Sequence, residues 1–95
     1  MAHDLVTVLT VVKARLNRLP TDTSLDMYLA KRIEAADEEL MHIGINLKAD
    51  SVEDMMLLSD YVAEGHSNRD KGGGMPEWLR LKRRERWLAD RRRAP

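Results

Sequence analysis

The chain has 95 residues, no cysteine, and equal numbers of basic and acidic side chains, 16 of each. This length predicts one small domain over residues 1–95, and the lack of cysteine excludes a disulfide framework or a thiolate metal site. No apolar run approaches the roughly 20 residues that cross a bilayer, and the first residues carry no basic secretion signal, so neither membrane insertion nor secretion is expected.

The charge is unevenly divided along the chain. Residues 1–74 hold 8 basic and 13 acidic side chains, a net charge of −5, whereas residues 75–95 hold 8 basic and 3 acidic ones, a net charge of +5. Two halves of opposite charge suggest complementary contact, either within one molecule or between copies.

The first predicted element is a helix over residues 4–19. Its apolar side chains recur at three- and four-residue steps, as on one face of a helix. They are Leu5, Leu9, Val12, Leu16 and Leu19. The β-branched run 6–12 would also suit a strand, but Asp4 at the start and Pro20 at the end favour a helix.

A second helix is predicted over residues 24–43. Thr23 or Ser24 would cap it, and Gly44 would end it in a left-handed conformation. The expected buried stripe is Leu25, Leu29, Ile33, Ala36, Leu40 and Ile43. Its other face carries several acidic residues.

A third helix is predicted over residues 52–67. Ser51 followed by Asp54 approximates a capping box. Its expected buried face holds Val52, Met55, Leu58 and Val62, with Met56 and Ser59 beside it.

A flexible loop over residues 69–75 follows, with Gly72, Gly73 and Gly74 as a hinge. Pro76 suits the first position of a helix, which predicts a fourth helix over 76–92. Its apolar stripe would run through Trp78, Leu81 and Leu88, with Leu79 adjacent and Trp87 off the stripe. The fold class expected is therefore all-α, a small bundle of about four helices with a Gly-rich loop before a basic C-terminal helix.

No catalytic, metal-binding or cofactor-binding constellation emerges from the sequence. His3, His42 and His66 are spread over three segments, and consecutive acidic residues at 37–39 point in different directions on a helix. The three glycines lack the Gly-Lys-Ser/Thr ending of a phosphate-binding loop. We therefore expect no enzyme activity, no metal and no cofactor.

The methionines offer a weaker signal. Met27, Met41, Met55 and Met56 fall at core or near-core helical spacing, where core filling is the default and an adaptable protein-binding surface is the alternative.

The basic C-terminal helix is the main candidate for function. Its candidate contact residues are Arg80, Lys82, Arg83, Arg84, Arg86, Trp87, Arg91 and Arg92. Arginines bind phosphates or carboxylates bidentately, so both nucleic acid and an acidic protein surface are possible partners, and a solvated charge run is a third interpretation. The acidic remainder of the chain and the lack of a clear helix-turn-helix favour protein contact.

The order of features from Tyr61 to Arg86 resembles one family. Tyr61 is followed by Asn68-Arg69-Asp70, the glycine loop, Met75-Pro76 and Trp78-Leu79-Arg80, and then by an Arg-rich helix. Together with the earlier pattern Leu-x-x-x-Leu-x-x-x-Ile-x-x-Ala, this resembles the small head–tail connector proteins of long-tailed bacteriophages and prophages, also called adaptor or head-completion proteins.

The resemblance implies a structural protein without catalytic residues. Such proteins assemble into a ring beneath the portal, extend the DNA channel and offer a surface to the next neck or tail component. The implied partners are the portal protein, a downstream head-completion or tail-terminator protein, and further copies of the chain. DNA would pass through the channel without sequence-specific binding. The implied location is the neck of the virion, and the host cytoplasm during assembly.

Two hypotheses complete the sequence analysis. First, an acidic face containing Glu34, Glu38, Asp54 or Asp60 complements the basic helix or lines the channel. Second, alternative functions are a small DNA-binding or packaging-associated protein, or an antitoxin-like helical module that folds fully on its partner.

Overall fold

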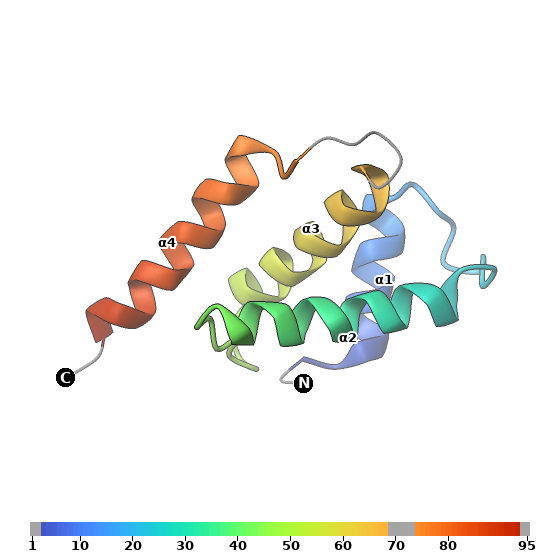
Figure 1. Ribbon diagram of the computed structural model, residues 1–95. Helices are drawn as coiled ribbons and strands as arrows, with labels where there is room; N and C mark the ends of the chain where they lie inside the picture. Colours follow the sequence, from blue (N-terminus) through green and yellow to red (C-terminus); the bar gives the residue numbers. More distant parts are fainter. Residues whose placement is uncertain (1–2, 69–73, 94–95) are drawn as a thin grey trace.

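The structure is a computed structural model that describes residues 3–68 and 74–93. It contains four helices, α1 (Leu5–Arg15), α2 (Asp26–His42), α3 (Val52–Asn68) and α4 (Glu77–Arg93), and the described residues form no strand. Helices α1, α2 and α3 pack on one another, and α4 leans against α3 at one side of this three-helix body (Figure 1). The predicted all-α architecture is confirmed.

The core lies between α1, α2 and α3. In α2 the predicted stripe is correct in its middle, where Leu29, Ile33 and Leu40 are fully buried and Ala36 nearly so. It fails at the C-terminal end, because Ile43 is 41% exposed. Periodicity therefore located the buried face of α2 but not where burial stops.

Helix α1 is shorter than predicted. It ends at Arg15, because Asn17 adopts a left-handed φ of 60° and the Arg18 N–H bonds back to the Lys13 carbonyl. Leu19 consequently lies outside the helix and is 71% exposed, so its predicted place in the core is wrong. Val8, which the predicted stripe omitted, is fully buried.

The predicted cap of α2 is also wrong. The N–H and hydroxyl of Ser24 donate to Asp22 Oδ1 at 3.0 and 2.7 Å, closing a turn before the helix. Leu25 is the N-cap and has no side-chain capping bond. Asp26, in the first turn, instead pairs with the buried Lys13 Nζ at 3.0 Å, which ties α2 to α1.

The starts of α1 and α3 follow the predicted chemistry more closely. The Asp4 carboxylate accepts from the Thr7 N–H, which favours helix over strand for the β-branched segment that follows. Ser51 Oγ accepts from the Asp54 N–H at 3.1 Å, so half of the expected capping box is present. The Asp54 carboxylate does not complete it, because it bonds elsewhere, as described next.

Candidate interaction surface around the basic helix

Helix α4 docks on the body through a face that the sequence analysis did not predict. Leu79 is 1% exposed and Trp87 packs against the core, whereas Trp78 and Leu81 are 40% and 50% exposed. The predicted stripe through Trp78, Leu81 and Leu88 is therefore not the docking face. Arg86, which directly precedes Trp87, supplies a charged part of the interface.

A nearly buried ion pair joins α4 to α3. The Arg86 guanidinium contacts the Asp54 carboxylate through Nε–Oδ1 at 2.7 Å and Nη2–Oδ2 at 3.0 Å, the bidentate geometry of strong arginine–carboxylate pairs. The side chains are 13% and 4% exposed. Arg86 also donates to the Asn46 carbonyl and pairs with Asp90, while Asp54 accepts from the Lys48 N–H. One arginine thus fastens α4 to both α3 and the connector before it.

The surroundings shift the pKa values of this network. Burial would raise the pKa of Asp54, but the hydrogen bonds from Arg86 and from the Lys48 N–H outweigh it and hold that pKa below its ordinary value. The pKa of Asp90 is lowered in the same way: burial opposes the shift, and the Arg86 and Asn46 N–H bonds dominate. The pKa of Arg86 is raised, chiefly by its hydrogen bond to Asp54.

These shifts predict that α4 docking is acid-labile. A carboxyl whose folded pKa is depressed contributes stability above its unfolded pKa, about 4, and loses that contribution as the pH falls through the folded pKa. We expect docking to weaken below about pH 4. Both tryptophans lie on α4, so an acid titration followed by tryptophan fluorescence measures this step. Asp54→Asn should flatten the acid dependence, and an unchanged profile in that variant would contradict the assignment.

A second attachment lies near the C-terminal end of α4. Arg91 Nη1 donates to the Gly44 carbonyl at 3.0 Å, and its guanidinium lies 4.2 Å from the Trp87 ring centroid. Gly44 has φ 96°, as expected for the residue after a helix, and a Cβ there would collide with the Arg91 guanidinium. The positive φ therefore favours glycine at this turn, and a side chain there would also displace the Arg91 guanidinium.

The N-terminal end of α4 meets α1. Arg15 Nε bonds to Asp60 Oδ1 at 3.0 Å, and its guanidinium lies 5.5 Å from the Trp78 ring centroid, with Lys82 at 5.6 Å from the same ring. The Asp60 side chain is only 8% exposed. Trp78 thus contacts two cations and is not buried in the core.

These contacts correct the hypothesis of one acidic face. Asp54 and Asp60 are buried in ion pairs of their own chain, because Arg86 and Arg15 neutralise them, and they do not belong to an exposed acidic surface. Glu34 and Glu38 are exposed on α2. Some of the opposite charges in the two parts of the sequence therefore pair within one molecule, as Arg86 does with Asp54.

The basic residues of α4 divide into two groups. Arg86 and Arg91 bond to the body, and Arg83 is half-buried beside Tyr61, whose hydroxyl donates to Glu39 at 2.7 Å. Burial, and then the Glu39 carboxylate, raise the pKa of Tyr61.

The second group is exposed and consists of Arg80, Lys82, Arg84 and Arg92. Among these, Arg80 makes a long ion pair with Glu77 at 3.8 Å within α4. We call these four residues the basic face, although Arg80 and Arg84 lie on the α2 side of the helix and Lys82 lies on its α3 side.

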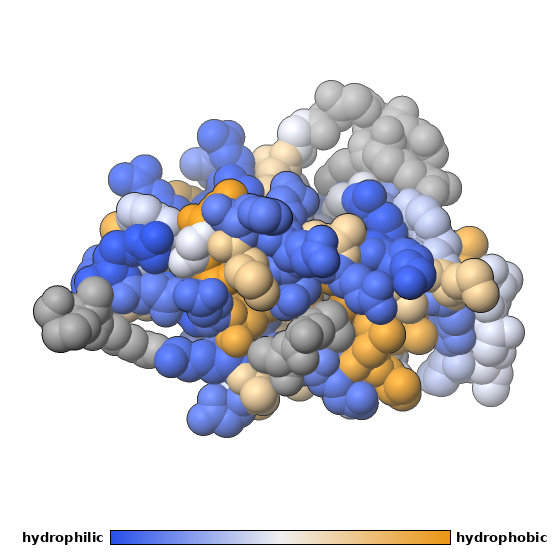
Figure 2. All heavy atoms as spheres, turned by 60° about the horizontal axis from the view of Figure 1, so that its bottom comes forward, coloured by the Kyte–Doolittle hydropathy of each residue, from blue (hydrophilic) through white to orange (hydrophobic). Residues whose placement is uncertain are grey.

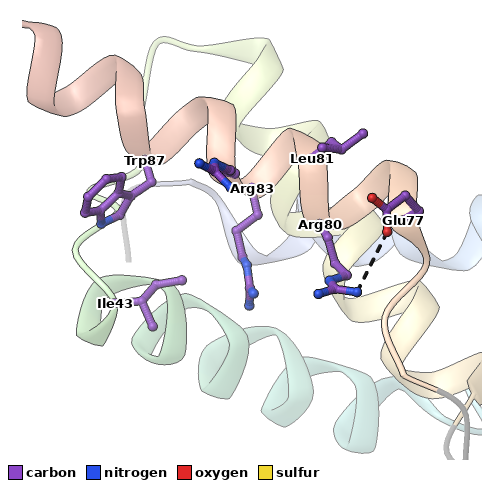
Figure 3. A pocket seen from close by; sticks show the side chains of 7 residues that line it. Ile43, Glu77, Arg80, Leu81, Arg83 and Trp87 are labelled. Atoms are coloured by element: carbon purple, nitrogen blue, oxygen red, sulfur yellow. Dashed lines mark ion pairs between the residues drawn. The ribbon is translucent and has the colours of Figure 1, made fainter.

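A groove of about 440 Å³ runs between α4 and the C-terminal end of α2 (Figure 3). Ile43 and Trp87 face one another across it, and Arg80 and Arg83 point from α4 toward α2. Leu81 and Arg84 complete the lining with Glu77. Apolar surface surrounded by guanidinium groups is typical of a protein-binding site with an acidic partner.

Other predicted features are more dispersed. Met27, Met41 and Met56 are 81%, 57% and 40% exposed, so core filling is wrong for these three, and only Met55 packs against the core. On the face that Figure 2 presents, hydrophobic atoms form separate small patches among hydrophilic ones.

Three further observations concern the predicted hinge, metals and membranes. Gly74 is exposed with open space around it, while Gly72 and Gly73 lie outside the described residues. Within 3–68 and 74–93, no cluster of three His, Asp or Glu side chains is arranged to hold a metal ion. No helix in that part of the chain is long and apolar enough to span a bilayer.

The basic face and the groove beside it are the candidate site that this geometry brings together. Comparison with protein-family models, with curated proteins and with solved structures found no match to this chain.

Proposed function

We propose that the protein is a structural component of a phage neck, and that the basic face of α4 docks on an acidic protein surface such as the portal or a neighbouring subunit. The observation that carries this proposal is that some arginines of α4 bond to the body while others are exposed to solvent. Arg86 and Arg91 anchor the helix, and Arg80, Arg84 and Arg92 remain exposed on this fixed support. Because the backbone of α4 is already folded and docked, binding through it costs little further backbone conformational entropy.

The resemblance over Tyr61 to Arg86 supports the neck assignment, and the groove supports protein as the partner. Its lining combines Trp87, Ile43 and Leu81 with arginines, and aromatic residues with arginine dominate the energetics of protein interfaces. In this proposal copies form a ring below the portal, and exposed Glu34 and Glu38 are candidates for a channel face that repels DNA.

DNA binding is the second candidate, because the four exposed cations of the basic face could also contact phosphates. Two features weigh against it. Acidic residues 34, 38 and 39 of α2 are exposed on the body that carries α4, and the groove has apolar lining from Ile43, Leu81 and Trp87 that a phosphate backbone would not use.

The test is charge reversal on the basic face. Arg80→Glu, Arg84→Glu and Arg92→Glu together should weaken binding to a phage portal protein from the same genome by at least about 100-fold, because three interfacial charge pairs of about 1 kcal/mol each are lost. Binding is measured by sedimentation of the portal assembly with labelled protein. Reversal of Arg83 or Arg86 would be a poor test, because Arg83 is half-buried and Arg86 holds α4 in place.

The matched control is Lys31→Glu on α2, an exposed residue away from α4, which should bind as the wild type does. Duplex DNA is the competing probe. Steeply salt-dependent binding to DNA, without binding to the portal, would replace the neck proposal with the DNA-binding one.

A further inference from the structure

A second groove lies along the opposite side of α4, between that helix and the start of α3. Its volume is about 720 Å³. Val52 and Met56 of α3 contribute exposed apolar surface, at 68% and 40%, with the buried Leu57 beside them. Exposed side chains of this size, grouped in a concave surface, are typical of binding grooves.

The two grooves beside α4 have opposite charge. Three arginines and one glutamate line the α2-side groove, a net charge of +2. Five carboxylates and three cations line the α3-side groove, a net charge of −2. Asp54 is neutralised by Arg86 and Asp60 by Arg15. The exposed charges that remain are Asp50, Glu53 and Glu85 against Lys48 and Lys82, a net charge of −1. We name this site the acidic groove.

The outer side of α4 has the complementary pattern. Leu81, Arg84, Leu88 and Arg92 follow one another at steps of three and four residues, which places them on one stripe of the helix. Leu81 is 50% exposed, and both arginines are exposed. An apolar and basic helical stripe is the ligand that an apolar groove with an acidic rim accepts.

We propose that the acidic groove binds the outer stripe of α4 from a second copy of this chain. Leu81 would lie against Val52 and Met56, and Arg84 and Arg92 would pair with carboxylates of the rim. This inference rests on the proposed function, since it names the partner of part of the same basic face. Stripe and groove are different surfaces, so the contact is heterologous and each added copy leaves one of each unoccupied.

Two single substitutions separate the surfaces. Leu81→Glu disables the stripe and leaves the groove intact, and Met56→Glu disables the groove and leaves the stripe intact. Both residues are exposed in the monomer, so folding should persist, as circular dichroism would verify. Each variant should self-associate at least about 100-fold more weakly than the wild type in sedimentation equilibrium. Met27→Glu, at an 81% exposed site on α2, is the control that should behave as the wild type.

Mixing the two variants tests the geometry. The intact stripe of Met56→Glu fits the intact groove of Leu81→Glu, so the mixture should form a 1:1 heterodimer and stop there, while the wild type grows beyond two copies. A wild type that remains monomeric up to about 1 mM, a wild type that stops at two copies, or a mixture that stays monomeric would each overturn the inference.

The same variants distinguish this inference from the proposed function. Met56→Glu retains the complete basic face, so it should still bind the portal protein when self-association is lost. Self-association through the groove without any portal binding would reject the neck proposal and leave the groove assignment standing. Portal binding by a wild type that never self-associates would do the reverse.

Discussion

Replacing Arg86 with methionine is expected to weaken the docking of α4 by about 3 kcal/mol, because the Asp54 carboxylate would then be buried without its partner. The Asp54 side chain is 4% exposed and the Arg86 side chain 13%, so water cannot easily replace the lost guanidinium. Methionine preserves most of the apolar stem. The expected result is faster amide hydrogen exchange throughout α4, with protection retained in α1, α2 and α3.

The control for this prediction is Arg84→Met, which removes the same group from an exposed position on the same helix and should leave exchange within α4 almost unchanged. The double variant Asp54→Asn with Arg86→Met should recover part of the loss, since the buried charge is then absent. If α4 in Arg86→Met exchanged as slowly as in the wild type, the apolar contacts of Leu79 and Trp87 would hold the helix without the ion pair.

The three-helix body could be predicted from sequence because its burial is mainly apolar. A stripe such as Leu29, Ile33 and Leu40 recurs with the helical period, and a hydrophobic core selects that period. The errors occur where polar groups set the boundary. Asn17 turns the chain out of α1 in a left-handed conformation. The apolar periodicity gave no sign of this turn, because Leu16 and Leu19 continue it.

Helix α4 could not be oriented from sequence for a different physical reason. Its most apolar stripe, which includes Trp78 and Leu81, is solvent-exposed, because the docking face uses Arg86 against Asp54, 32 positions earlier in the chain. An ion pair between distant residues has no periodic signature. The charge division of the sequence did indicate complementary contact, but only the structure shows which charges are used within the molecule.

The charged residues of the candidate site could be predicted from sequence, but its grooves could not. Charge counting identified the basic helix and its arginines, and composition identified Glu34 and Glu38 as acidic surface residues. The grooves were missed, because each combines side chains from segments far apart in the chain. The exposure of Val52 and Met56 was the decisive signal for the acidic groove, and helical periodicity had assigned Val52 to the core.

Replacing Leu58 with alanine is expected to lower the free energy of unfolding of the whole domain by about 3 kcal/mol, through lost apolar burial and the cavity that remains. Leu58 is fully buried in the cluster formed by α1, α2 and α3. A chain of this size has a total stability of about 5–14 kcal/mol, so the loss is a large fraction of it. Urea denaturation followed by circular dichroism measures the change as a lower midpoint with an unchanged slope.

Val52→Ala on the same helix is the matched control, because Val52 is 68% exposed and alanine is the better helix former. Its unfolding free energy should stay within about 0.5 kcal/mol of the wild type.

Comparison of Leu58→Ala with Arg86→Met separates the stability of the whole domain from the stability of α4 docking. Leu58→Ala should accelerate exchange in all four helices together, whereas Arg86→Met should do so in α4 alone. Equal effects of both substitutions on every helix would show that α4 and the body unfold as one cooperative unit.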